Sequence, residues 1–104
     1  MIFLIVDIIE YFSNDFPGFV RCKFTDIYNK THYFYEKVPI VSSENINEFS
    51  IFPRNGYIAG EIINKENDII TFSIMEPYNI TSDKNISIFF VKDNKVIEMD
   101  LLTD

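Results

Sequence analysis

Hydrophobic and polar residues alternate along several short segments of the chain. A period of two residues is typical of β-strands that bury one face. Ile70, Phe72 and Ile74, for example, alternate with Thr71 and Ser73, which predicts that the three apolar side chains point inward and the two hydroxyls outward. The same reasoning predicts about seven strands, at residues 2–9, 19–27, 32–41, 57–63, 69–75, 86–91 and 96–101.

Short polar segments rich in Asn, Asp, Gly and Pro separate most of these strands. Strands joined by such short turns pair in antiparallel fashion. Because few helical segments are available to cover a sheet, the sheet must close on itself or form two layers. We therefore predict an all-β fold, a small antiparallel β-barrel or barrel-like sandwich, as a single domain over residues 1–104.

The inward faces of the clearest strands are predicted from this alternation. We expect inward side chains at Val20, Cys22, Phe24, Phe34, Val38, Ile40, Ile58 and Ile62. The first strand differs, since both of its faces begin with apolar residues. Such a strand is covered on two sides or lies at an interface, so a homodimer formed through this strand is one interpretation.

A segment of fifteen residues, 42–56, has no clean period. Ser43 is a candidate N-cap for a single helical turn over residues 44–48. Loops of this length are uncommon in small domains and are often functional. Four of its residues suit a contact surface with a basic partner: Glu44, Glu48, Phe49 and Phe52. The alternative is that the two phenylalanines plug the end of the barrel.

Tyrosines form a second candidate surface. Tyr28, Tyr33, Tyr35 and Tyr57 are placed to share one outer face, and tyrosine is enriched at binding hot spots. The alternative is that they are half-buried residues of the strands that carry them.

The formal net charge of −7 argues against nucleic acid or an anionic membrane as a partner, because both require a basic face. It permits a basic protein partner. The single cysteine excludes an internal disulfide and favours a reducing, cytoplasmic location. The apolar N-terminal stretch has no basic region before it and is too short to span a membrane.

Motifs for catalysis or cofactors are missing from the sequence. Cys22 lies between apolar residues of a strand and is interpreted as a small buried side chain, and His32 as a turn or surface residue. One Cys and one His are too few for a structural zinc site, and the three glycines are too isolated for a phosphate loop. We predict no catalytic residue, no metal and no cofactor.

Glu36 is the polar residue with the strongest claim to a special role. It alternates in phase with Phe34 and Val38, so it is expected either at the rim with its carboxylate in water or inside, as an acid with a raised pKa. The second possibility would make the protein a small-ligand binder or an enzyme with a site in the barrel mouth.

Several stretches resemble a family of small, largely uncharacterised bacterial proteins. They are residues 15–20, 24–26 and 36–41, followed by Phe52-Pro53 and Gly56-Tyr57-Ile58. Some small acidic proteins of this sort act as immunity proteins beside secreted toxins, and the resemblance implies such a role. Together these observations predict a non-enzymatic protein-interaction module that binds a basic partner.

Overall fold

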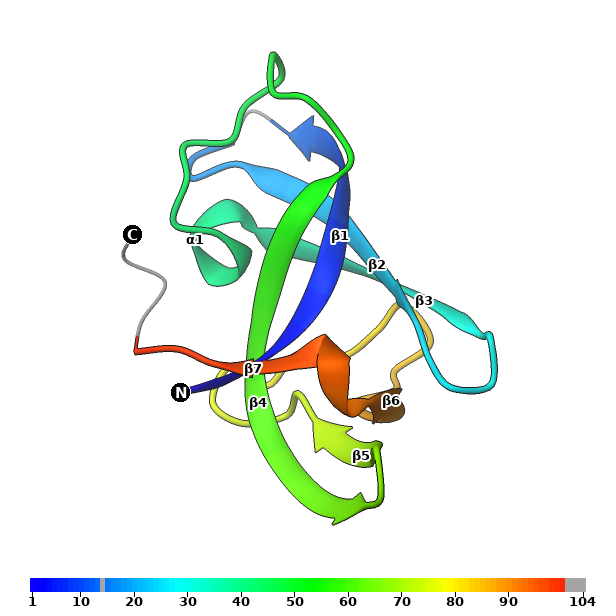
Figure 1. The fold of residues 1–104 in the computed structure, drawn as a ribbon. Coiled ribbons are helices and arrows are strands. Elements are labelled where there is room, and N and C mark those ends of the chain that lie inside the picture. The colour runs from blue at the N-terminus through cyan, green and yellow to red at the C-terminus, as the bar shows by residue number, and fades with distance from the viewer. Residues whose placement is uncertain (14, 101–104) are drawn as a thin grey trace.

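The computed structural model describes residues 1–13 and 15–100, in which seven antiparallel strands curl into a half-barrel (Figure 1). Six of them form the path β3-β2-β1-β4-β5-β6, and β7 pairs with β1. The strands are β1 (Ile2–Ser13), β2 (Phe19–Thr25), β3 (Thr31–Lys37), β4 (Arg54–Glu66), β5 (Ile69–Ser73), β6 (Ile88–Lys92) and β7 (Val96–Glu98). The predicted all-β antiparallel fold is confirmed.

The first strand, β1, lies in the centre of the sheet. β4 pairs along one edge over residues 2–8, while β7 covers residues 2–4 and β2 residues 7–13 of the other edge. Both faces of β1 are apolar because both are covered. Leu4 and Val6 join the main core, and Phe3 is buried on the opposite face against the Tyr57 ring.

The long strand β4 connects the two halves of the sheet. Residues 54–60 pair with β1, and residues 61–66 pair with β5. Gly60 stands where the partner changes, and a Cβ atom there would lie 2.2 Å from the backbone oxygen of Ser73. No side chain fits at that distance, so the close approach of β4 and β5 requires glycine.

One hydrophobic cluster fills the concave side of the sheet. It contains the predicted inward residues Val20, Cys22, Phe24, Phe34, Val38, Ile58, Ile70, Phe72 and Ile74. Two predictions of side-chain direction are wrong. Ser73 is buried, with its hydroxyl accepting a hydrogen bond from Met75 N, and Ile62 is exposed because β4 runs past the core near a register shift between Ile62 and Asn64.

The two end strands of the sheet, β3 and β6, approach each other through side chains and turns. The ring of Phe89 on β6 lies 4.7 Å from the ring of His32 on β3, measured between centroids. Backbone bonds from Ile27 N to Phe90 O, 3.0 Å, and from Asp83 N to Tyr33 O, 2.9 Å, reinforce the approach. In the described part of the chain, β3 and β6 form no ladder with each other, which is why the barrel is half closed.

The predicted strand over residues 32–41 ends early, at Lys37. It continues as a helical turn, α1 (Val38–Val41), closed by a bond from Ser42 N to Val38 O. Pro39 is tolerated in this first turn because its missing N–H has no helical partner there. The helical turn predicted over residues 44–48 does not form, so Ser43 caps no helix.

Other strand bounds differ from the predicted ones at their ends. β1 and β4 are longer than expected, because each gains a further partner strand beyond its apolar segment. The last predicted strand ends at Glu98, and its residue 101 lies outside the described residues. A single 3-10 turn, η1 (Asp93–Lys95), joins β6 to β7. Across residues 1–13 and 15–100, no helix is long and apolar enough to cross a membrane.

Candidate functional site

Two loops meet at one end of the half-barrel. The ladder of β1 and β2 ends at Ser13 and Phe19, and the ladder of β2 and β3 ends at Phe19 and Lys37. Val38 N donates to Gly18 O at 3.0 Å, which fixes the start of α1 beside the first loop. α1 leads directly into the second loop. We call residues 15–18 and 42–53 the loop end of the molecule (Figure 1).

The loop end carries the three most exposed large apolar side chains of the described residues. Phe16 is 97% exposed, Phe49 is 87% exposed and Ile51 is 82% exposed. Single exposed apolar residues are common on protein surfaces, but a group of such residues on neighbouring loops indicates a contact surface.

Local hydrogen bonds hold Phe49 out in water. Asn47 Oδ1 accepts a bond from Phe49 N at 2.8 Å, and Asn47 O accepts one from Ser50 N at 3.0 Å. Asn47 N in turn donates to Ser50 Oγ at 2.9 Å. Asn side chains commonly make such turns with the backbone that follows. The result is a fixed turn with a phenylalanine at its tip.

The two phenylalanines of the long loop play different parts. Phe52 is partly buried and packs against the hydrophobic cluster, as expected of a residue that plugs the barrel end. Ile46 is also buried and anchors the same loop. Phe49 makes no such contribution, since most of its surface is exposed. Phe52 therefore fits the plug interpretation and Phe49 does not, while the contact-surface interpretation of Phe49 stays a prediction.

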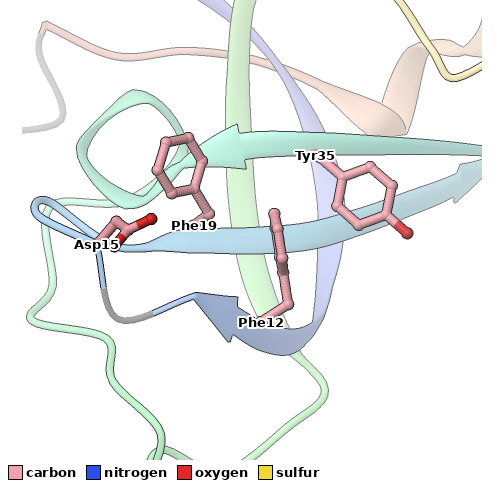
Figure 2. Close-up of a pocket in the computed structure, with 4 residues that line it drawn as sticks. All are labelled: Phe12, Asp15, Phe19 and Tyr35. Carbon is pink, nitrogen blue, oxygen red and sulfur yellow. The ribbon is translucent and has the colours of Figure 1, made fainter.

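A shallow apolar groove lies next to the loop end. It has a volume of about 600 Å³ and is lined by Phe12, Asp15, Phe19 and Tyr35 (Figure 2). The Phe12 ring lies between the other two rings, 4.7 Å from Tyr35 and 5.9 Å from Phe19 between centroids. Phe12, Phe16 and Ile51 were not predicted as site residues. The sequence feature that could have identified Phe16 is an aromatic residue next to a proline turn.

The four tyrosines do not form one cluster. Tyr33 and Tyr35 share the guanidinium of Arg21, which lies 4.3 Å and 5.7 Å from their ring centroids. Tyr57 packs on Phe3 instead, and Tyr28 on Phe90. The predicted cluster of four tyrosines therefore does not form, because Tyr28 and Tyr57 have other aromatic partners. Tyr57 lies apart from β3 because β4 pairs with β1.

The two acidic residues of the long loop also differ. Glu44 Oε2 accepts a hydrogen bond from Arg54 Nη2 at 2.9 Å, so part of its charge is neutralised within the molecule. Glu48 is exposed at the tip. Exposed ion pairs contribute little to stability, so both carboxylates can be changed at a small cost.

His32 is a partly buried residue of β3, which contradicts its assignment to a turn or the surface. Its side chain is 10% exposed and packs beside the rings of Phe24 and Phe89, at 5.2 Å and 4.7 Å between centroids. His32 Nε2 lies 2.8 Å from Asp26 Oδ2, and the Asp26 side chain is 8% exposed. The pair connects the β2–β3 turn to the core.

Asp26 also organises the turn itself. Its Oδ1 accepts bonds from Tyr28 N at 2.8 Å and Lys30 N at 3.0 Å. Burial by itself raises the pKa of Asp26, but the hydrogen bonds from His32 and the two backbone amides outweigh it, and the pKa lies below its ordinary value.

We expect Asp26→Asn to destabilise the protein by about 1–3 kcal/mol at pH 7, because it weakens several bonds to a buried acceptor. The lowered pKa adds a pH dependence. The ionised carboxylate stabilises the fold fully above the unfolded pKa of about 3.9, and this contribution is lost as the pH falls through the lower folded pKa. Urea unfolding at pH 7 and in the acid range should show a difference between variant and wild type that shrinks at low pH. A difference in the free energy of unfolding that stays constant with pH would show that the ionised Asp26 carboxylate is not what stabilises the fold.

The remaining ionisable candidates are Cys22 and Glu36. Burial, assisted by the charge of Glu36, raises the pKa of the Cys22 thiol to about 12, so almost no thiolate exists at neutral pH. Cys22 is confirmed as a small buried side chain by its complete burial in the core. Burial also raises the pKa of the half-buried Glu36, while the backbone N–H and the charge of Lys37 oppose the rise.

Metal ligands are not grouped in the described residues: no three His, Cys, Asp or Glu side chains stand close enough to hold an ion.

No known protein family, no curated protein and no solved structure matches this chain. The bacterial family resemblance therefore stays a prediction, and any functional inference has to come from the residues themselves.

Proposed function

We propose that this protein is a non-enzymatic interaction module that binds a basic protein partner through the loop end. The carrying observation is that the three most exposed apolar side chains of the described residues, Phe16, Phe49 and Ile51, all belong to the two loops of the loop end. Aromatic side chains on such loops supply the buried area of a binding hot spot.

Charge supports the choice of a basic partner. The chain carries a net charge of −7, and Glu48 stands exposed at the loop tip beside Phe49. A carboxylate at the rim of an apolar contact speeds the association with a positively charged surface. An immunity-type role, in which the module covers a basic toxin, is the specific form of this proposal.

The rival function is a small-ligand or enzymatic site at Glu36. Its support is the raised pKa of that carboxylate, since perturbed groups gather at functional sites. Such a site also needs a deep pocket beside the acid. The groove at the loop end is open and apolar, and its lining is made by Phe12, Asp15, Phe19 and Tyr35 rather than by Glu36. This favours the interaction module.

The experiment begins with capture of partners from the source cell on immobilised wild-type protein, followed by mass spectrometry. We expect Phe49→Ser combined with Ile51→Ser to weaken binding of the captured partner at least about thirtyfold, as hot-spot residues do. Both side chains are largely in water, so the melting temperature should stay within a few degrees of wild type.

The matched control is Ile62→Ser combined with Ile63→Ser, two exposed apolar residues near the far end of β4. This variant should bind like wild type. Glu48→Lys should slow association at low salt, with the difference shrinking as salt screens the charges. Equal binding by both double variants would place the site elsewhere, and an unchanged rate for Glu48→Lys would argue against a basic partner.

A further inference from the structure

Basic side chains gather along β2 and around the β2–β3 turn. Five of the nine Lys and Arg residues line two pockets beside the β2–β3 turn. They are Arg21, Lys30 and Lys84 in one pocket and Lys92 and Lys95 in the other. A local positive field of this kind attracts anions.

The larger of these two pockets has a volume of about 450 Å³, within the range of small-molecule sites. We call it the basic pocket. Besides its three cationic residues it is lined by Tyr33 and by one carboxylate, that of Asp83. One net positive charge remains when Asp83 and Glu10, the ion-pair partner of Arg21, are counted against the three bases.

One wall of the basic pocket is a turn with a fixed shape. Asp83 N donates to Tyr33 O on the outer edge of β3 at 2.9 Å. The hydroxyl oxygen of the buried Ser82 accepts bonds from Lys84 N at 3.3 Å and Ile86 N at 3.2 Å. Lys84 is therefore carried on a backbone that is held to the sheet, and little ordering of this wall would be needed on binding.

The opposite wall is the β2–β3 turn, which is fixed as well. Asp26 accepts backbone bonds from Tyr28 N and Lys30 N, and its other oxygen lies 2.8 Å from His32 Nε2. The carboxylate of Asp26 is thus satisfied by groups of its own hairpin. Lys30, next to it in the turn, has its backbone held while its side chain is exposed.

Arg21 has donor capacity that the described residues do not use. Its Nη1 forms an ion pair with Glu10 Oε1 at 3.8 Å, beyond a good hydrogen bond, whereas its Nε is buried and out of reach of a ligand. Stacking on the rings of Tyr33 and Tyr35 holds the guanidinium plane in position. An arginine oriented in this way is suited to an oxyanion.

We propose that the basic pocket binds a small molecule through its phosphate group, with Arg21, Lys30 and Lys84 contacting the phosphate oxygens. A phosphate monoester carries up to two negative charges and several acceptor oxygens, which matches three cations better than a single carboxylate does. The ring of Tyr33 offers an apolar wall for the organic part of the molecule. This site is independent of the protein contact at the loop end.

The test is a titration of the ¹⁵N-labelled protein at low ionic strength, followed by NMR, with inorganic phosphate, phenyl phosphate and succinate as separate probes. We expect saturable shift changes confined to residues 21, 30–33 and 83–86 with both phosphate probes, and tighter binding of phenyl phosphate than of inorganic phosphate. Lys30→Gln combined with Lys84→Gln should weaken binding at least about tenfold, because two charge-assisted contacts are removed.

The charge-matched control is Lys37→Gln combined with Lys65→Gln, two exposed lysines outside the basic pocket. It should bind phosphate within about twofold of wild type. Shifts that are spread over the surface without saturation would overturn the proposal, as would equal losses in the two double variants. Succinate binding as tightly as phenyl phosphate would show a general dianion site and overturn the assignment to phosphate.

Discussion

Phe72→Ala should lower the free energy of unfolding by about 3–5 kcal/mol, the loss typical of a truncated buried phenylalanine. Phe72 on β5 is fully buried within the hydrophobic cluster, and its ring also packs close to Gly60, so the cavity left by the variant could collapse only by moving β4. Total stabilities of small domains are only about 5–15 kcal/mol, so this loss is a large share. Urea unfolding monitored by circular dichroism measures it.

The control for this variant is Phe90→Ala on the neighbouring strand β6. Phe90 is 41% exposed and contacts only the edge of the Tyr28 ring among the aromatic side chains described, so about 0.5–1.5 kcal/mol should be lost. Equal losses for the two variants would show that the inward face of β5 is assigned wrongly.

Gly60→Ala should destabilise the protein by about 3 kcal/mol or more, although it adds one methyl group only. At a position that accepts alanine, the same change stabilises a protein by about 0.4–1 kcal/mol, through the unfolded chain. Here the added Cβ would meet the Ser73 backbone oxygen at 2.2 Å and the Phe72 ring at 2.5 Å. A backbone oxygen cannot rotate away, so β4 and β5 would have to separate.

Gly56→Ala is the matched comparison on the same strand. Its Cβ would meet the side chain of Ile8 at 2.7 Å, and the nearest backbone atom, Val41 O, only at 3.4 Å. A side chain can shift further than a backbone carbonyl, so the loss should be smaller than for Gly60→Ala. Thermal unfolding of both variants provides the ranking, and the reverse order would contradict the close approach of β4 and β5.

Local alternation was enough to predict the fold class and most of the core. Val20, Cys22 and Phe24 are buried as predicted, because a strand with one wet face leaves a period of two in the sequence. The pairing partner of each strand could not be predicted from local alternation. Nothing local shows that β4 pairs with β1, 46 to 58 residues earlier in the chain, so the sequence does not reveal that Tyr57 lies apart from the tyrosines of β3.

The candidate site was predicted in part for a similar reason. Phe49 was expected on an exposed loop because its segment has no period, and it is exposed there. Phe12 was overlooked, because register shifts between Ile8 and Glu10 and between Tyr11 and Ser13 interrupt the pattern along β1. His32 is buried by Phe89, a contact across the two ends of the sheet that no short segment contains.

The central position of β1 has a consequence for the time order of folding. β1 is the first strand of the chain, yet residues 2–4 find one neighbour in β4 and the other in β7, with Ile2 opposite Gly60 and Glu98. During synthesis on the ribosome, both edges of this apolar strand can be paired only after residue 98 has been made. Pairings so distant in sequence close slowly, and unpaired apolar strands aggregate in the meantime.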